Sequence, residues 1–415
     1  MNVLHFSTFD MAGGSAKSAL RIHTSLCEIG VNSSMLVSRK DSDLENVAEM
    51  TSSLIQRKLN AVTSSVLSAF GKQYSYIPFS PGISKNGWLS SADIIQIYNI
   101  HGDYLSFDIL SRLAKSAPIV IRLSDLWPFT GHCAYPGSCN RWVDGCGRCP
   151  DLSLYPAVGL DLTAHLWKKK QRFFRDNDVT IVAPSSWAYE SAKKSPFIAN
   201  DRIFKIYNGI DLRIFRESCK IEAREKLGIH KKYTAILFIS EKAYPNPRKG
   251  TDILEAALRI IGCRKDICLI VVGHHSERWI AKVPIKVYSL GSITSVSDII
   301  KIYSSADIVC VPSSDENLPN TIIESCAFGR PVVSMNTGGI KDGVHDLKTG
   351  ILCKHKDPNE FAARLVSLID DPLARVKMGS AARQLAEEKF DSKREADRFS
   401  QLYEEILQGK HGRPH

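Results

Sequence analysis

The stretch SSDENLPNTIIE, residues 313–324, decides the fold. An apolar strand is predicted to end at residue 312, and a helix is predicted to start near Asn320, which we expect to be its N-cap. Peptide N–H groups of Asn317, Leu318 and the helix start would then point toward one place, where the helix dipole favours a phosphate. Glu316 lies in the loop and Glu324 about one turn into the helix, so one carboxylate can meet a sugar hydroxyl while the other takes a ribose diol. The alternative is a pair of ordinary surface glutamates.

Strands and helices alternate on both sides of this stretch. Two such series of similar length meet near the segment YNGID, residues 207–211. The pattern predicts an α/β protein with two doubly wound parallel-sheet lobes that face a cleft, with ligands at the carboxyl ends of the strands. The predicted strands are 2–7, 34–38, 93–98, 119–123 and 179–183 in the first series, and 235–240, 267–273, 307–312 and 331–335 in the second. Residues 51–87 give no clear pattern.

Composition narrows the class of protein. The chain has 415 residues, of which 44% are hydrophobic and 24% charged, as in globular proteins. No apolar run approaches the ~18 residues that span a bilayer, and the first residues do not look like a secretory signal, so we expect a cytoplasmic protein. The net charge of +10 favours anionic partners without separating nucleotides, membranes and nucleic acid.

The second half of the chain resembles family 4 glycosyltransferases of the two-lobed GT-B architecture. The resemblance rests on the spacing of Glu316 and Glu324, on SCAFGRPVV (325–333), and on Gly338-Gly339. Shorter pieces follow the same order: YNGID (207–211), RKG (248–250), VG (272–273), LG (290–291), ADI (306–308) and GIL (350–352). The resemblance implies a retaining transferase that moves a sugar from a nucleotide-sugar to an acceptor hydroxyl without a catalytic metal.

The resemblance also implies the roles of the lobes. Residues 1–212 would form the acceptor-side lobe, with a cysteine-rich insertion at 131–150, and residues 213–391 the lobe that binds the nucleotide-sugar. Residues 392–415 would form a C-terminal helix, which crosses back to the first lobe, and a tail. The donor would be a UDP- or GDP-sugar, and the acceptor a lipid-linked or oligosaccharide glycan of the colanic-acid-like kind in bacterial surface polysaccharide assembly.

Residue roles follow from the matched motifs. Lys249, with Arg248 beside it, would neutralise the diphosphate leaving group, which gains charge as the glycosidic bond breaks. Glu324 would hold the ribose, and Glu316 would lie against the donor sugar. A solvated loop is the alternative for the Arg-Lys pair. The donor-binding residues that we expect are Gly13, Gly14, Arg248, Lys249, Gly273, Ile293, Glu316, Asn317, Leu318, Asn320 and Glu324.

The acceptor side matches the family less well. The segments YNIHG (98–102) and LSDLW (123–127) each follow a strand, but Tyr98 and Ser124 stand where the family usually has histidines. We expect His101 and Asp125 to be acceptor-site residues, and together with Glu316 and Lys249 they make up the predicted catalytic set. A hydrogen-bonded structural histidine is the alternative for His101.

Four cysteines lie close together in the sequence, at Cys133, Cys139, Cys146 and Cys149. In a reducing compartment such a cluster is more typical of a metal site than of disulfides, and four thiolates would close the coordination sphere of Zn²⁺. The prediction is a structural zinc with no part in catalysis. Free thiols and disulfides are the alternatives.

A basic and aromatic stretch, LWKKKQRFFR (166–175), allows two interpretations. It could lie as a helix on an anionic inner-membrane surface, which would suit a lipid-linked acceptor. Otherwise it packs Trp167 and Phe174 into its own lobe.

Two other functions compete with the transferase. A non-catalytic or chemically different member of the same architecture is open because of Tyr98 and Ser124. A zinc-bearing nucleic-acid-binding protein would use the charge and the cysteines. We expect no nucleic-acid partner, because the ordered motifs belong to a nucleotide-sugar site and not to a reading module.

Overall fold

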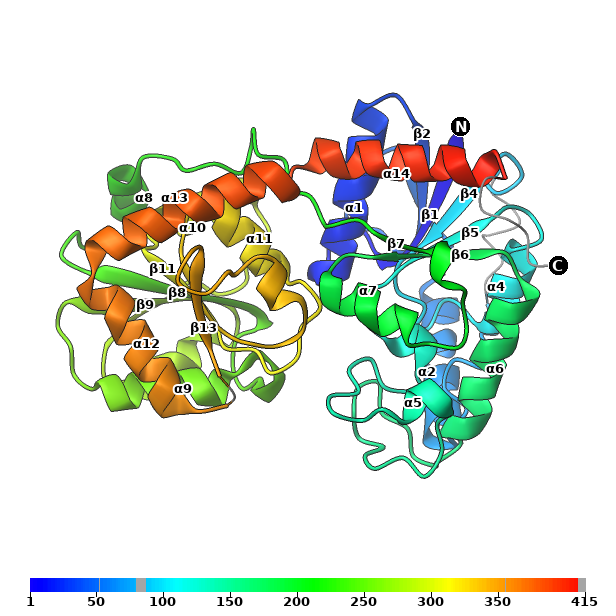
Figure 1. Ribbon diagram of the computed structural model, residues 1–415, viewed down its shortest axis with the longest axis horizontal. Helices are drawn as coiled ribbons and strands as arrows, with labels where there is room; N and C mark the ends of the chain where they lie inside the picture. Colours follow the sequence, from blue (N-terminus) through cyan, green and yellow to red (C-terminus); the bar gives the residue numbers. More distant parts are fainter. Residues whose placement is uncertain (52, 80–86, 355, 410–415) are drawn as a thin grey trace. The chain divides into compact units, whose positions relative to one another are not determined.

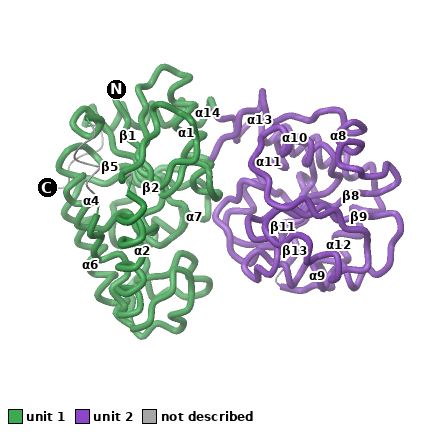
Figure 2. Tube along the Cα trace, turned by 180° about the vertical axis from the view of Figure 1, so that it is seen from behind, with its two compact units in different colours: residues 1–207, 393–415 green, residues 208–392 purple. Residues whose placement is uncertain are grey.

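The computed structural model describes residues 1–51, 53–79, 87–354 and 356–409, and the chain forms two compact units (Figures 1 and 2). The first unit comprises residues 1–207 and 393–415, and the second unit residues 208–392. The change of unit falls after Tyr207, slightly earlier than the predicted boundary at 212. Of the predicted terminal segment, residues 410–415 lie outside the described residues.

The first unit is built on a parallel sheet whose described strands follow the order β3-β2-β1-β4-β5-β6-β7. Crossovers between parallel strands require helices on the faces of the sheet. The strands are β1 (Asn2–Phe9), β2 (Asn32–Arg39), β3 (Val47–Glu49), β4 (Ile94–Ile97), β5 (Ile119–Arg122), β6 (Val179–Ala183) and β7 (Ile203–Lys205). The helices are α1 (Gly13–Glu28), α2 (Leu54–Ala69), α4 (Phe107–Leu113), η1 (Trp127–Phe129), α5 (Arg141–Asp144), α6 (Thr163–Asp176), α7 (Ser186–Lys193), η2 (Asn200–Arg202) and α14 (Ser392–Leu407).

Both faces of this sheet are buried, because successive side chains of a strand point to opposite faces. Val3 belongs to a core with residues of α1 and α14, whereas Leu4 belongs to a second core with residues of α4 and α6. This arrangement explains why the strands read as continuous apolar runs and not as alternating ones.

The second unit repeats the plan with a sheet whose described strands follow the order β10-β9-β8-β11-β12-β13. Helix α9 packs against α12, α8 against α10, and α11 against α13. The strands are β8 (Thr234–Lys242), β9 (Ile267–His274), β10 (Lys286–Ser289), β11 (Ile308–Val311), β12 (Val332–Met335) and β13 (Gly350–Cys353). The helices are α8 (Lys220–Lys226), η3 (Pro247–Lys249), α9 (Thr251–Ile261), η4 (Ser276–Ala281), α10 (Val296–Ser305), α11 (Asn320–Ala327), η5 (Gly338–Asp342), α12 (Pro358–Asp370) and α13 (Pro372–Lys389).

Helix α14 ends the described chain, and it packs on the first unit although it follows the second in sequence (Figure 1). Phe399 and Tyr403 are fully buried in the core that contains Val3. The Tyr403 hydroxyl donates a hydrogen bond to the side-chain oxygen of Gln96 on the sheet. The predicted return of the C-terminal helix to the first lobe is confirmed.

Helix α6 packs its aromatic face into the core and does not present it to a membrane. Trp167 and Phe174 are 6% exposed, and Leu166 and Phe173 are 3% exposed. The interpretation in which residues 166–175 pack Trp167 and Phe174 into their own lobe is therefore confirmed, and contact of this segment with a membrane stays a prediction. Among the described residues no helix has the length and apolar character needed to cross a bilayer.

Candidate functional site

The first candidate region lies where β8 and β11 end, side by side in the second sheet. The loop after β8 contains η3 with Arg248 and Lys249, and the loop after β11 contains Asp315 and Glu316. Hydrogen bonds to backbone carbonyls join these loops. The peptide N–H of Ser314 donates to the Arg248 carbonyl at 2.9 Å, and Arg248 Nη1 donates to the Asp315 carbonyl at 3.2 Å. The topology thus brings together residues that are far apart in sequence.

Glu316 is the electrostatic centre of this region. Its side chain is 6% exposed and forms an ion pair with Lys249 Nζ, while Arg248 Nη1 lies 3.7 Å from Oε1 of the same carboxylate. Burial alone would raise the pKa of Glu316, but the charges of Lys249 and Arg248 hold that pKa below its ordinary value. Glu316 is therefore a buried carboxylate with two partly exposed cations beside it.

The close approach of these loops requires glycine at two positions. Gly250 takes a φ of +71°, and a Cβ there would lie 2.0 Å from the Pro312 carbonyl oxygen. Gly338 takes a φ of +51°, and its Cβ would lie 1.8 Å from the Glu316 carbonyl oxygen. Neither position accepts a side chain without moving the loop that carries Glu316.

Helix α11 follows the Glu316 loop, as predicted, but its cap differs from the prediction. Asn320 is the first helical residue, and Pro319 occupies the N-cap position without a side-chain cap. Proline suits this place because it has no N–H and its φ of −69° already lies in its fixed range. Asn317 and Leu318, just before the helix, are buried.

Glu324 lies on α11 and is 9% exposed. Its Oε2 accepts a hydrogen bond of 2.9 Å from the Tyr303 hydroxyl of α10, and the Tyr303 ring stacks on Phe328 at 5.1 Å. Tyr303 thus fixes one oxygen of the carboxylate. The sequence did not point to Tyr303, which lies in an ordinary amphipathic helix.

The remaining predicted donor residues of this unit lie after the neighbouring strands. Gly273 is the second-last residue of β9, and its N–H donates to the Gly291 carbonyl at 2.7 Å, so this N–H supports the loop after β10. Gly291 in turn donates to Ser276 Oγ at 3.0 Å. Ile293 lies in the loop between β10 and α10 and is partly buried.

The second candidate region lies where β1, β4 and β5 end in the first sheet, again side by side. Gly13-Gly14 opens α1 after β1. The next residue, Ser15, donates to Asn99 Oδ1 at 3.2 Å after β4, and its hydroxyl lies 2.7 Å from the hydroxyl of Ser124 after β5. Neither Ser15 nor Asn99 was predicted as a site residue, although Ser15 follows Gly13-Gly14 directly and Asn99 lies within the segment YNIHG.

The structure brings His101 and Asp125 into direct contact in this region. His101 Nε2 lies 2.8 Å from Asp125 Oδ2, and both side chains are under 10% exposed. Asp125 Oδ1 accepts the Trp127 peptide N–H at 2.9 Å, which fixes the carboxylate. The rings of Trp127 and Tyr155 lie 5.7 and 5.6 Å from the imidazole. Nδ1 of His101 is buried and has no hydrogen-bond partner among the described residues.

The two departures from the family pattern have clear positions. Tyr98 is buried, and its hydroxyl lies 2.9 Å from His5 Nδ1 and accepts from Gln96 Nε2. It belongs to the core beneath the region and cannot replace a histidine at the strand ends. Ser124, by contrast, lies at the strand ends and contacts Ser15.

The four clustered cysteines are free thiols that share one neighbourhood. Burial raises the pKa of Cys133 to about 12 and that of Cys146 to about 11. Cys149 Sγ lies 3.3 Å from His132 Nε2. Within the described part of the chain, no three His, Cys, Asp or Glu side chains are arranged as metal ligands.

Several solved structures share this fold. The structure superimposes on HepE from Anabaena in complex with UDP-glucose with a TM-score of 0.69 at 16% identity, covering 97% of this chain and 99% of that one. Sucrose-phosphate synthase from Thermosynechococcus elongatus gives a TM-score of 0.72 at 18% identity, covering 99% and 100%. WaaG, a glycosyltransferase involved in lipopolysaccharide biosynthesis, gives 0.67 at 15% identity, covering 98% and 100%. At such identities the likeness shows the fold, which is the two-unit GT-B architecture.

The family comparison concerns the second unit. Residues 220–385 match the family model described as glycosyl transferases group 1. D-inositol 3-phosphate glycosyltransferases from Thermobispora bispora and Segniliparus rotundus are 29% identical over 230 residues and 31% identical over 212 residues. These matches cover 51% and 48% of this chain, and the chain spans about half the length of each relative, 52% and 46%.

Proposed function

We propose that this protein is a retaining glycosyltransferase that moves a sugar from a nucleotide-sugar to an acceptor hydroxyl. The observation that carries the proposal is the group of Glu316, Lys249 and Arg248 at the ends of β8 and β11, inside a group 1 domain. A buried carboxylate beside two partly exposed cations suits a ligand that carries both a sugar and a diphosphate. HepE, which has the same fold, has been solved with UDP-glucose.

The proposed reaction begins with the bond between the sugar and the diphosphate. As this bond breaks, negative charge develops on the leaving phosphate oxygen, and Lys249 and Arg248 would stabilise it. Arginine adds two parallel N–H donors for phosphate oxygens, which lysine lacks. Glu316 would accept a hydrogen bond from a hydroxyl of the donor sugar, and Glu324 would accept hydrogen bonds from the ribose hydroxyls. The peptide groups near Gly13-Gly14 would approach the diphosphate.

The proposed acceptor site is the region of the first unit where β1, β4 and β5 end. His101 and Asp125 would position the acceptor hydroxyl, and the leaving phosphate could take its proton. The new bond joins the acceptor oxygen to the sugar on the same face that the phosphate leaves. No metal takes part in this scheme.

The acceptor that we propose is a lipid-linked or oligosaccharide glycan in surface polysaccharide assembly. WaaG, which shares the fold, is involved in lipopolysaccharide biosynthesis. The sequence relatives are instead D-inositol 3-phosphate glycosyltransferases, and this favours a test of a cyclitol phosphate as a second acceptor class.

A thermal-shift panel with UDP, GDP, ADP and their sugar conjugates tests the proposal first. A ligand that binds only the folded state raises the melting temperature by mass action, so no acceptor is needed. We expect a shift with one base and a larger shift with its sugar conjugate. A panel in which no nucleotide changes the melting temperature would contradict the proposal and favour a non-catalytic member of the architecture.

A structural zinc at Cys133, Cys139, Cys146 and Cys149 is a separate proposal. It is supported by the spacing of the four cysteines and by their proximity in the structure. A negative charge on Cys149 would raise the pKa of both Cys133 and Cys146. Elemental analysis of the purified protein should find one zinc per chain. Metal-free protein with four titratable thiols in this loop would contradict it.

A further inference from the structure

Tyr155 is an exposed aromatic residue that lies against the predicted acceptor-side histidine. Tyr155 is 63% exposed, whereas His101 is 7% exposed. The two rings meet at 83° with their centroids 5.6 Å apart, so an edge of one ring touches the face of the other. Such a contact covers only part of the Tyr155 ring, and the rest of the ring is open to a ligand.

The backbone at Tyr155 is held by hydrogen bonds from two other segments of the first unit. The Tyr155 carbonyl accepts the Ala134 N–H at 2.7 Å. The carbonyl of the next residue, Pro156, accepts from Gln73 Nε2 at 2.7 Å and from His132 Nδ1 at 3.1 Å. His132 and Ala134 belong to the cysteine-rich insertion. An exposed side chain on a fixed backbone can contact a ligand at a small cost in conformational entropy.

The same hydrogen bonds connect Tyr155 with the His101–Asp125 pair. Trp127 Nε1 donates to Gln73 Oε1 at 2.7 Å, and Gln73 is only 3% exposed. The peptide N–H of Trp127 donates to Asp125 Oδ1 at 2.9 Å. A buried amide therefore joins the Tyr155 segment to the residue that fixes Asp125, and buried contacts set the place of the Tyr155 ring.

The segment that carries Gln73 is strained beside His101. Tyr74 takes a φ of +49°, which a bulky aromatic residue rarely adopts. Its ring lies 6.5 Å from the imidazole of His101 and 5.6 Å from the ring of Trp127. Residues held in such conformations cluster at functional sites. The rings of Tyr74, Trp127 and Tyr155 thus surround a histidine whose Nδ1 is buried and has no hydrogen-bond partner in the described part of the chain.

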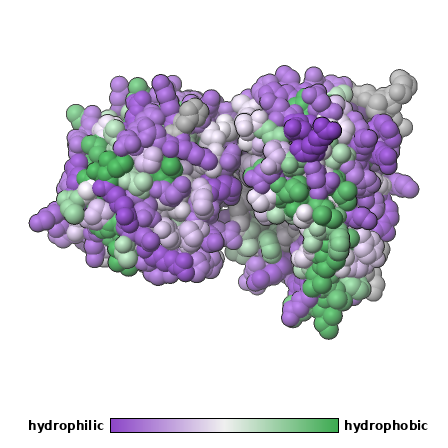
Figure 3. Space-filling model, turned by 90° about the horizontal axis from the view of Figure 1, so that it is seen from below, coloured by the Kyte–Doolittle hydropathy of each residue, from purple (hydrophilic) through white to green (hydrophobic). Residues whose placement is uncertain are grey.

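An exposed tyrosine can also be an ordinary surface residue. Exposed apolar side chains are not rare on the first unit, where Figure 3 shows a band of them. Tyr155 differs from a scattered surface residue, because its ring touches buried His101 and its backbone is held from two sides. These two observations together point to a ligand that lies on the ring.

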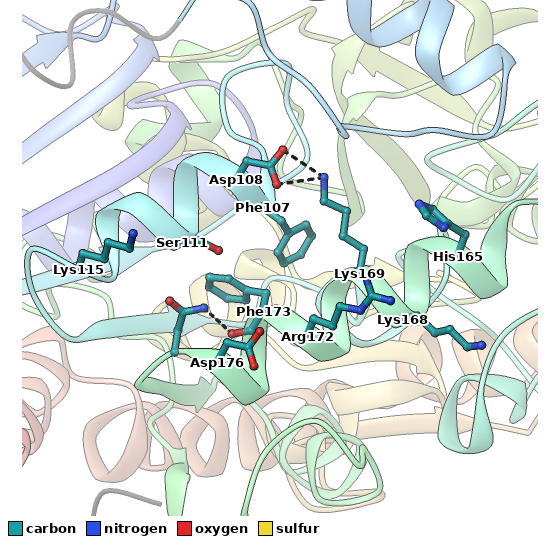
Figure 4. A pocket seen from close by; sticks show the side chains of 11 residues that line it. Phe107, Asp108, Ser111, Lys115, His165, Lys168, Lys169, Arg172, Phe173 and Asp176 are labelled. Carbon is teal, nitrogen blue, oxygen red and sulfur yellow. Dashed lines mark hydrogen bonds and ion pairs between the residues drawn. The ribbon is translucent and has the colours of Figure 1, made fainter.

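The cavity between α4 and α6 on the same unit has a different character. It has a volume of about 460 Å³, and Lys168, Lys169 and Arg172 line it (Figure 4). Its two phenylalanines, Phe107 and Phe173, are 5% and 3% exposed, so neither has a face open to a sugar ring. Its basic side chains suit an anion. Tyr155 is therefore the better place for an uncharged sugar.

We propose that Tyr155 is the stacking platform for an uncharged pyranose ring of the acceptor, at the place where β1, β4 and β5 end. A face of a pyranose ring consists largely of C–H groups, which pack on an aromatic ring, while the hydroxyls at its rim reach polar groups. The hydroxyl that attacks the donor sugar would then lie at the His101–Asp125 pair. The inference rests on the proposed transfer reaction and names its acceptor class, an uncharged sugar.

Saturation-transfer NMR on the full chain tests the platform without a transfer step. The probes are the methyl α- and β-glycosides of glucose, galactose and mannose at millimolar concentration, with and without the nucleotide found in the thermal-shift panel. We expect the wild type to bind at least one of them. Tyr155→Ala should weaken that binding about tenfold, because it removes the aromatic face. Tyr155→Phe keeps the ring and should bind like the wild type.

A kinetic measurement with the same glycoside as acceptor separates binding from chemistry. Tyr155→Ala should raise the acceptor KM about tenfold and leave the donor KM unchanged, because the lost contact is made only to the acceptor. A rise in the donor KM instead would overturn the assignment of Tyr155 to the acceptor.

Tyr76→Ala is the matched control, because Tyr76 is a tyrosine of the same unit that is 59% exposed, and it should leave sugar binding unchanged. Equal sugar binding by Tyr155→Ala and the wild type would overturn the proposal, as would the absence of binding by every methyl glycoside. Binding of myo-inositol 1-phosphate alone, unaffected by Tyr155→Ala, would overturn it in favour of a charged acceptor. Failure of the transfer reaction itself would appear separately, as a wild type whose melting temperature no nucleotide changes.

Discussion

The carboxyl ends of the two sheets have the same geometry and opposite chemistry. In the second unit this edge carries fixed charges, with Glu316 buried beside Lys249 and Arg248. In the first unit it carries neutral hydrogen-bonding groups and the His101–Asp125 pair, enclosed by aromatic rings. The same parallel-sheet fold therefore offers two kinds of site. The strand ends of the second unit suit a leaving group that gains charge, and those of the first unit suit a hydroxyl that must only be oriented.

The most direct test of this difference between the two units is to remove a charge from the strand ends of the second unit. We expect Lys249→Ala to lower kcat for sugar transfer about 10²–10³-fold, because the leaving diphosphate loses a stabilising cation. The variant should also be less stable by about 1–3 kcal/mol, since buried Glu316 loses its ion-pair partner. Steady-state kinetics and thermal melting measure the two effects.

Lys242→Ala is the matched control, because Lys242 is an exposed lysine at the end of the same strand, β8. It should leave both stability and kcat nearly unchanged. An equal loss in the two variants would mean that general positive charge, and not the Glu316 group, supports the reaction.

The neutral edge is tested by His101→Gln and Asp125→Asn. Each should lower transfer about 10-fold to 100-fold, the size of a lost hydrogen bond to a charged group, while nucleotide binding stays unchanged. The double variant should be little worse than either single variant, because the two side chains contact each other. If either change weakened nucleotide affinity instead, the division between the two edges would be wrong.

A smaller effect is expected within the charged unit, at Glu324. Glu324→Ala should weaken nucleotide binding by about 1–3 kcal/mol, the scale of a hydrogen bond to a carboxylate. Tyr303→Phe keeps the carboxylate and removes only the hydroxyl that fixes it, so its effect should be smaller. Isothermal titration with the nucleotide found in the thermal-shift panel gives both values. Unchanged affinity in Glu324→Ala would exclude the ribose contact.

The smallest expected effect is the pH dependence of stability at Glu316. Its pKa in the folded protein lies below the ordinary value of 4.5. The ion pair therefore adds stability above that ordinary value, and the contribution is lost as pH falls through the lower, folded-state pKa. The melting temperature of the wild type should exceed that of Glu316→Gln by about 2–4 °C at neutral pH. The difference should vanish in acid, and a constant difference would contradict the assignment.

Much of the fold could be predicted because buried parallel strands are short apolar runs. The prediction at 179–183 coincides with β6, and the terminal helix at 392–407 coincides with α14. Strands β3, β7, β10 and β13 were missed. Each lies at the edge of its sheet and is only three or four residues long, so its run of residues is too short to show a pattern.

The charged region was easier to predict than the neutral one. Its residues lie in two short motifs whose loops the topology joins, at 248–250 and 313–324. The neutral region depends on Ser15, Asn99 and Ser124, which meet across separations of 84 and 109 residues. Small polar residues are common in loops, so no local signal marks that contact. Helix α2 was missed for another reason, because its polar residues face inward.

The return of α14 to the first unit determines the order in which the two units can fold during synthesis. The second unit is one uninterrupted segment, residues 208–392, whereas the core of the first needs Phe399 and Tyr403 from the end of the chain. During synthesis a domain folds when all of its chain is available. The unit that starts first is therefore completed last, and a chain cut after residue 392 would keep the whole second unit but lack part of the core of the first.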